Sequence, residues 1–142
     1  MMDTPAPIAR LLDHPCTLLV TRICVTLPFL IAGIFKLTDW SSGVAEMESV
    51  GLRPAGLFNL LTLVTELGGS TLVIIDRRTW LGAGALGVFT VLTTFLAHRY
   101  WEFEGAARLQ QFNSFLEHVT IAAAFILVTV LSVRSHHTKG LS

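Results

Sequence analysis

The sequence predicts an all-α integral membrane protein, built as a single-domain four-helix bundle that covers residues 1–142. Three features of the composition and one of the patterning indicate this class. Apolar residues make up 52% of the chain, only 14% of the residues are Asp, Glu, Lys or Arg, and the mean hydropathy is +0.64. Soluble domains carry about 25% charged residues, so the lipid bilayer is the expected partner. The formal net charge is zero, which argues against a nucleic-acid partner.

The patterning consists of four apolar runs, each long enough to cross a membrane. A helix rises about 1.5 Å per residue, so about 20 residues match the roughly 30 Å of hydrocarbon. Pro54 stands just before the second run, at a position that a helix start tolerates. We expect His98, Arg99 and Tyr100 to extend the third run. The predicted helices cover approximately residues 17–37, 56–75, 80–100 and 115–133.

These helices pair as two hairpins, which places both termini on the same side of the membrane. The charged turn at residues 76–79 joins the second helix to the third. The side that holds the termini carries six Lys or Arg residues, counting Arg22 as a side chain that snorkels to that surface, and the other side carries four. The positive-inside rule then places both termini on the cytoplasmic side. We expect a multi-pass protein of the bacterial inner membrane.

Glu66 is the most informative residue, because it lies near the middle of the second apolar run. Placing an ionised carboxylate in hydrocarbon costs several kcal/mol. We therefore expect Glu66 to be protonated, paired with another residue, or facing a polar cavity.

The topology brings other polar residues to the outer end of the bundle, above Glu66. Lys36 ends the first helix, His98 ends the third, and Glu117 and His118 begin the fourth. A direct contact between Lys36 and Glu66 stays open, because on ideal geometry their depths differ by about 10–15 Å. That contact needs a tilted helix, a deeper Lys36 or a bridging water. A contact between Glu117 and His98 is easier, since both lie at the outer end of adjacent helices.

Each of these residues also has a purely structural interpretation. Lys36 can be an interfacial anchor, His98 an interfacial hydrogen-bonding group, and Glu117 with His118 a cap on the fourth helix. Small residues are expected to let the helices approach closely. The glycines assigned to helix packing are Gly33, Gly68, Gly69 and Gly87.

The segment between the third and fourth helices interleaves aromatic and charged side chains around Trp101. This composition suits a lid at the outer interface, beneath which a flat aromatic ligand can enter, and it equally suits an ordinary aromatic girdle. No metal site is predicted, because His98 and His118 have no recognised ligand spacing. Cys16 and Cys24 are eight residues apart, or about 12 Å along a helix, which is too far for a disulfide.

Four stretches, in this order and spacing, resemble the DoxX family of small four-helix membrane proteins, and particularly its YphA-type branch. They are FLIAGIFKLTDW, TELGG, AHRYWEF and EHVTIAAAFIL. The glycine and lysine of the family's first helix fall on Gly33 and Lys36, and its second-helix glutamate falls on Glu66. Relatives often begin the fourth helix with a Lys-Asn pair, where this chain has Glu117 and His118, so a role of that lysine does not carry over.

The resemblance implies a link to membrane redox chemistry. Some DoxX relatives are associated with a thiosulfate:quinone oxidoreductase or with complexes that handle thiol and oxidative stress, and others occur beside quinone- or catechol-detoxifying enzymes. The chain has no redox motif of its own, so it is expected to carry no intrinsic cofactor, to bind a quinone and to depend on a redox protein partner.

Two hypotheses follow for the function. In the first, the protein is a quinone-associated accessory subunit of redox or oxidative-stress chemistry, in which Lys36, His98 and His118 donate hydrogen bonds and Glu66 carries protons. Trp101 and Glu117 complete the candidate pocket. In the second, the protein is a non-catalytic membrane scaffold or a small-molecule permeation path. Permeation would call for a homodimer, because one four-helix chain is small for transport.

Overall fold

The computed structural model describes the backbone of residues 4–139 and the side chains of residues 4–134, and every regular element within that part of the chain is helical. The predicted all-α membrane fold is confirmed, because four of the helices are long and apolar enough to cross a bilayer. The elements are α1 (Ala6–Leu12), α2 (Pro15–Thr38), α3 (Trp40–Ser49), α4 (Ala55–Ile74), α5 (Thr79–Ala97), the 3₁₀ turn η1 (Tyr100–Glu102) and α6 (Gly105–Lys139).

The bounds of the first two membrane helices agree with the prediction, whereas those of the last two differ. Helix α5 ends at Ala97 rather than at residue 100, because His98 takes the non-helical backbone of a C-cap, with φ −112° and ψ 57°. Helix α6 begins at Gly105 instead of residue 115. Its first turns are too polar to stand out as an apolar run, but Ala, Leu, Arg and Gln are good helix formers. The expected lid is therefore largely the start of α6.

The short helix α3 was not predicted, and it lies between the two helices of the first hairpin. Asp39 caps its start, with Oδ1 accepting hydrogen bonds from the Ser42 backbone N at 3.0 Å and from Ser41 Oγ at 2.8 Å. The hydroxyl of Ser42 donates to Oδ2 at 2.7 Å. The hydrogen bonds from Ser42 and Ser41 hold the pKa of the Asp39 carboxyl below its ordinary value.

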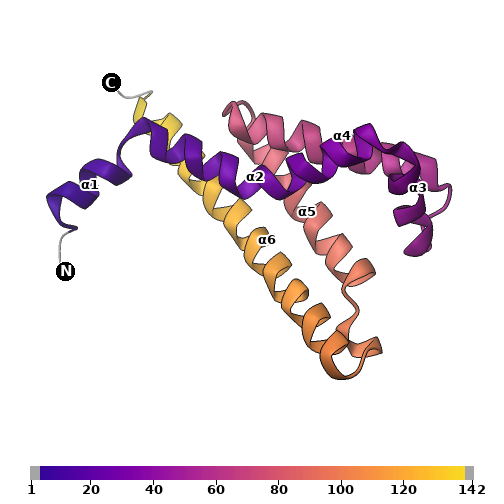
Figure 1. Cartoon of the computed structure of the whole chain (residues 1–142). Coiled ribbons are helices and arrows are strands. Elements are labelled where there is room, and N and C mark those ends of the chain that lie inside the picture. The colour runs from indigo at the N-terminus through magenta and orange to yellow at the C-terminus, as the bar shows by residue number, and fades with distance from the viewer. Residues whose placement is uncertain (1–3, 140–142) are drawn as a thin grey trace.

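The membrane helices form two antiparallel pairs that cross each other (Figure 1). Helix α4 packs against α2 on one side and α5 on the other, α5 packs along α6, and α2 has only a small contact with α6. The start of α2 and the end of α6 lie at the same end of the bundle, as predicted, whereas α3 and η1 lie far apart at the other end (Figure 1). The two pairs therefore diverge toward the end that carries α3 and η1.

The apolar core lies where the two pairs cross. It is formed by buried residues of all four membrane helices, namely Phe29, Val73, Ala83, Leu86, Phe125 and Val128. The rings of Phe29 and Phe125 pack with centroids 5.5 Å apart, which joins α2 to α6. Most other large apolar side chains on these helices are exposed on the outside of the bundle, as expected where lipid is the solvent.

Three glycines let the membrane helices approach closely, at the α2–α4 and α4–α5 contacts. A Cβ on Gly33 would lie 2.6 Å from Leu67 Cδ2, and one on Gly82 would lie 2.6 Å from the Gly69 carbonyl oxygen. A Cβ on Gly69 would lie 2.8 Å from Leu86 Cγ, so α4 and α5 are in tight contact at this point. Two of the glycines assigned to packing lie elsewhere. Gly68 has open space beside it, and Gly87 has only an ordinary contact at 3.9 Å.

A partly buried polar network ties the four membrane helices together near the termini. Arg22 Nη2 of α2 lies 2.8 Å from Asp76 Oδ2 in the α4–α5 turn. Asp76 Oδ1 accepts hydrogen bonds from Thr79 Oγ1 at 2.8 Å and from Ser132 Oγ at 2.6 Å. Arg22 is only 8% exposed, so the expectation that it snorkels to the surface was wrong. A carboxylate within reach holds the guanidinium inside the bundle.

Candidate functional site

A cavity of about 500 Å³ lies between the two helix pairs, on the side where they diverge. Most of its wall is apolar and comes from α2, α4 and α5, with Phe29, Leu61, Phe89, Leu92 and Leu96 among the lining residues. Its charged and titratable groups come from two places. Lys36, Glu46 and Glu66 line it from α2, α3 and α4, and His98 and His118 line it from the α5/α6 pair.

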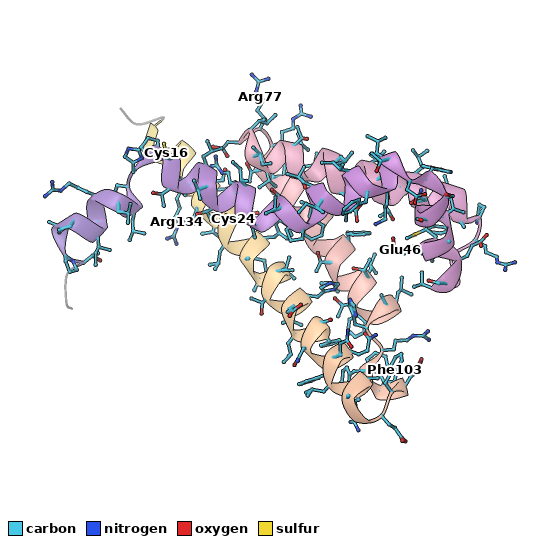
Figure 2. All side chains as sticks on the ribbon, in the orientation of Figure 1. Cys16, Cys24, Glu46, Arg77, Phe103 and Arg134 are labelled. Carbon is cyan, nitrogen blue, oxygen red and sulfur yellow. The ribbon has the colours of Figure 1, made fainter. Side chains whose placement is uncertain are left out.

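Lys36 is the centre of the first polar group. Its Nζ lies 3.4 Å from Glu66 Oε1 and 3.1 Å from Glu46 Oε2. The side chains of Lys36 and Glu66 are 9% and 5% exposed, whereas that of Glu46 is 56% exposed. Figure 2 labels Glu46 on α3, where this helix lies against the α2/α4 pair. One ammonium group therefore joins a buried and an exposed carboxylate from two other helices.

The depth argument that left the Lys36–Glu66 contact open treated the helix ends as level, and the structure differs. Helix α3 packs on the first part of α4, where Thr62 Oγ1 lies 3.8 Å from Met47 Sδ. The end of α2 meets α4 more than two turns along, at Glu66. Gly33 allows this approach, because a side chain there would collide with Leu67.

The second carboxylate oxygen of Glu66 is buried, and no described side chain or backbone group hydrogen-bonds to it. A carboxylate oxygen can accept more than one hydrogen bond, and a buried polar atom without a partner is uncommon in proteins. Glu66 Oε2 is therefore a buried oxygen that can still take part in a hydrogen bond.

His98 and His118 form the second polar group. Their rings pack edge to face, with centroids 4.6 Å apart. The Nδ1 atom of His98 lies 2.9 Å from Gln111 Oε1, and that of His118 lies 3.0 Å from Thr94 Oγ1. The expected contact of His98 with Glu117 is replaced by these contacts to Gln111 and His118. Gln111 had no signal in the sequence, because α6 was predicted to start after it.

The remaining predicted pocket residues lie outside the cavity. Glu117 is exposed on α6, well inside the helix and not at its start. His118 is the next residue, about 100° further round the helix, and it faces the cavity. Trp101 is 50% exposed in η1 and packs on Tyr100, with ring centroids 5.2 Å apart. Phe103 marks this end of the α5/α6 pair, well away from Glu46 (Figure 2).

The cavity contains one charged residue that the sequence interpretation missed. Glu46 lies on α3, and the prediction treated this stretch as a loop. Asp39, followed by serines that its carboxylate can bind, is a typical helix N-cap and was the available signal. Among the described residues, no group of three or more His, Cys, Asp or Glu is placed to hold a metal ion.

The fold and the cavity define a polytopic four-helix membrane protein with a mostly apolar, partly open cavity and two polar groups. Residues 17–99 match the DoxX family, and the chain belongs to that family, as the sequence resemblance predicted. The matched region contains Lys36, Glu46, Glu66 and His98, whereas Gln111 and His118 lie beyond it.

Two relatives from Escherichia coli strain K12 cover most of the chain. The chain is 30% identical to inner membrane protein YphA over 117 residues, which are 82% of this chain and 84% of the relative. It is 30% identical to inner membrane protein YqjF over 112 residues, which are 79% of this chain and 81% of the relative. No solved structure matches the chain. The protein is therefore a multi-pass inner-membrane protein.

Proposed function

We propose that this protein binds the ring of a membrane-soluble quinone couple in the cavity between its helix pairs, as an accessory subunit of a redox or oxidative-stress system. The observation that carries this proposal is the cavity itself. Its volume of about 500 Å³ lies within the roughly 300–1,000 Å³ of small-molecule sites. Apolar and aromatic side chains make up most of its wall, and two polar groups are available to orient a ring.

A membrane-soluble ligand suits this cavity better than a water-soluble one. The helices around it are apolar enough to cross a bilayer, and the chain has few charges that could attract an ionic substrate. In the proposed orientation, with both termini in the cytoplasm, the Lys36 and His98 end of the cavity faces the outer side of the membrane.

The redox partner is a separate protein in this proposal. The cavity side chains provide acid–base groups, including Glu66, His98 and His118. Neither cysteine lines the cavity, and both are exposed on α2, so a thiol pair at the bound ring is not available. Electrons would therefore pass between the ring and a partner, while this chain holds the ring.

Binding can be tested on the full chain purified in mild detergent and transferred to lipid nanodiscs. Organic extraction followed by chromatography would detect a co-purified quinone, and titration with a short-chain alkyl benzoquinone couple would give a Kd. The informative variant is Ala32→Leu, because Ala32 lines the cavity and the larger side chain fills it. The matched control is Ala123→Leu, since Ala123 is exposed on α6 and does not line the cavity.

We expect at least a tenfold weaker Kd in Ala32→Leu and an unchanged Kd in Ala123→Leu. If the wild-type chain neither retains nor binds a quinone or its reduced form, the proposal is wrong. Equal weakening by the two variants would locate binding outside this cavity and would also contradict it.

A non-catalytic scaffold is the second candidate, and it is favoured by one observation. Lys36 joins three helices through two carboxylates, an arrangement that can serve stability alone. The substitution Glu66→Gln separates the two functions. A lower melting temperature with an unchanged Kd for the ring would favour the scaffold, whereas a weaker Kd at an unchanged melting temperature would favour the binding site.

A further inference from the structure

We infer that the cavity selects the reduced, hydroxyl-bearing member of the couple, a hydroquinone, over the oxidised quinone. This inference rests on the proposed function and names the form of the ring that the site takes. It follows from the number of hydrogen-bond donors in the cavity that are still free to bind a ligand. A quinone carbonyl can only accept hydrogen bonds, whereas a phenolic hydroxyl can also donate one.

The threonine hydroxyls that line the cavity have already donated their single hydrogen. Three of them donate to backbone carbonyl oxygens one turn earlier on their own helices, and Thr62 is directed at the sulfur of Met47. Their remaining capacity toward a ligand is therefore their oxygen lone pairs. The three carbonyl contacts are Thr65 Oγ1 to Leu61 O at 2.8 Å, Thr90 Oγ1 to Leu86 O at 2.7 Å, and Thr93 Oγ1 to Phe89 O at 3.0 Å.

The histidines are also left with acceptors. Thr94 Oγ1 donates to the Thr90 carbonyl oxygen at 2.6 Å, so its lone pair must accept the hydrogen of His118 Nδ1. The side-chain oxygen of Gln111 can only accept, so Nδ1 of His98 is the donor in that contact. A neutral imidazole with hydrogen on Nδ1 carries its lone pair on Nε2. No described residue hydrogen-bonds to Nε2 of either histidine.

With Glu66 ionised in its pair with Lys36, Lys36 is the one cavity side chain, among those described, with a donor hydrogen left over. An ammonium group has three N–H bonds, and its contacts to Glu46 and Glu66 engage two of them. Against this single donor stand the lone pairs of the threonines and of the two imidazoles. A quinone would place carbonyl oxygens among acceptors, whereas a hydroquinone would donate two hydrogen bonds to them.

The size of the preference can be estimated from other binding sites that distinguish ligands with and without a hydroxyl group. Sites built to bind a hydroxyl reject analogues without it by about 10⁴- to 10⁵-fold, because the buried polar groups of the site are left unpaired. This cavity is partly open and has one spare donor, so we expect a preference of at least about tenfold. Tighter binding of the reduced form raises the midpoint potential of the bound couple by about 30 mV for each tenfold ratio in this two-electron reaction.

The test compares three probes on the full chain in lipid nanodiscs under anaerobic conditions. The probes are a short-chain alkyl hydroquinone, the matching alkyl benzoquinone, and the dimethyl ether of the hydroquinone, which keeps the aromatic ring and both oxygens but carries a methyl group in place of each O–H hydrogen. Isothermal titration calorimetry or equilibrium dialysis gives each Kd. We expect the hydroquinone to bind at least tenfold more tightly than either of the others.

Two variants test whether the histidine hydrogens set this preference. In Thr94→Val and in Gln111→Leu the acceptor for one Nδ1 hydrogen is lost, so that imidazole can move its hydrogen to Nε2 and donate to a carbonyl. The ratio of the two Kd values should fall by at least threefold in each variant, mainly through tighter quinone binding. Thr120→Val is the control, since its hydroxyl donates to the Leu116 carbonyl on the exposed face of α6, and it should leave the ratio unchanged.

The outcomes separate this inference from the proposed function. If none of the probes binds, the proposed function is wrong, and the inference falls with it. If the quinone binds as tightly as the hydroquinone or more tightly, or if the dimethyl ether matches the hydroquinone, the inference is overturned while the proposed function stands. The three-probe comparison on the unmodified chain decides this even where a variant fails to fold.

Discussion

Lys36 and Glu66 form an ion pair across the α2–α4 interface, with 3.4 Å between Nζ and Oε1. Both side chains are buried, and the same ammonium group also contacts the exposed carboxylate of Glu46 on α3. A pair of this kind couples the stability of the bundle to the polar end of the cavity, because it fixes two membrane helices and the connecting helix through a single atom.

Removing Lys36 should destabilise the protein strongly. In Lys36→Met the buried Glu66 loses its charge partner, and breaking a buried ion pair from one side costs about 3–5 kcal/mol. The double substitution Lys36→Met with Glu66→Leu removes both charges, so it should recover much of that loss. The free energy of unfolding in mixed detergent micelles measures both effects.

Glu46→Gln is the comparison for that experiment. Glu46 is largely exposed, and exposed ion pairs contribute about 0–1 kcal/mol. Should Glu46→Gln cost as much as Lys36→Met, or should the double substitution be less stable than Lys36→Met alone, the structural role assigned to the buried pair would be contradicted.

The Asp76 network at the opposite end of the bundle predicts a second sensitive position. Arg22→Leu removes the guanidinium that lies 2.8 Å from Asp76 Oδ2, and it leaves the carboxylate in a partly buried turn. We expect a loss of about 2–4 kcal/mol, somewhat below the range for fully buried pairs. Arg10→Leu on the exposed face of α1 is the control and should stay within about 0.5 kcal/mol. Thermal unfolding of the two variants side by side checks this, and equal melting temperatures would contradict it.

The four membrane helices could be predicted from the sequence because a long apolar run is a strong signal that does not depend on any single residue. The cavity residues depended on weaker signals. Helix α3 is short and mixes polar with apolar side chains, so it escaped notice, and Glu46 was missed with it. The start of α6 is polar, which hid Gln111 and made Glu117 and His118 look like the first residues of a helix.

Two further properties of the site depend on geometry that a sequence does not contain. The contact of Lys36 with Glu66 results from the stagger of α2 against α4, and α3 packs against both of these helices. The choice between Glu117 and His118 depends on the rotation of α6 about its axis, since one residue changes the direction of a side chain by about 100°. Glu66 could be singled out because the cost of a charge in hydrocarbon does not depend on either.

The contact between α4 and α5 predicts opposite effects for two glycines on the same helix. A Cβ on Gly82 would lie 2.6 Å from the Gly69 carbonyl oxygen, whereas Gly84 has open space beside it. Gly82→Ala should destabilise by about 1–3 kcal/mol, since the backbones must move apart. Gly84→Ala should be neutral or stabilise by up to about 1 kcal/mol, because Ala is the better helix former. Unfolding free energies decide the matter, and the same sign for both variants would count against the tight contact.

The contact of α3 with α4 gives a last prediction, in which a second substitution should reverse the effect of the first. Gly43 lies directly against the fully buried side-chain amide of Asn59, and a Cβ there would lie 2.8 Å from Asn59 Nδ2 and closer still to Oδ1. Gly43→Ala should therefore cost about 1–3 kcal/mol through overpacking. In the Asn59→Ala background the amide is absent, so the added methyl group should be tolerated or should fill part of the space that Asn59 leaves.

A double-mutant cycle of unfolding free energies measures this coupling, which we expect at about 1–3 kcal/mol for residues in direct contact. Additive effects of the two substitutions would show that α3 does not pack on α4 through this pair, and Glu46 would then lose the support that holds it beside Lys36.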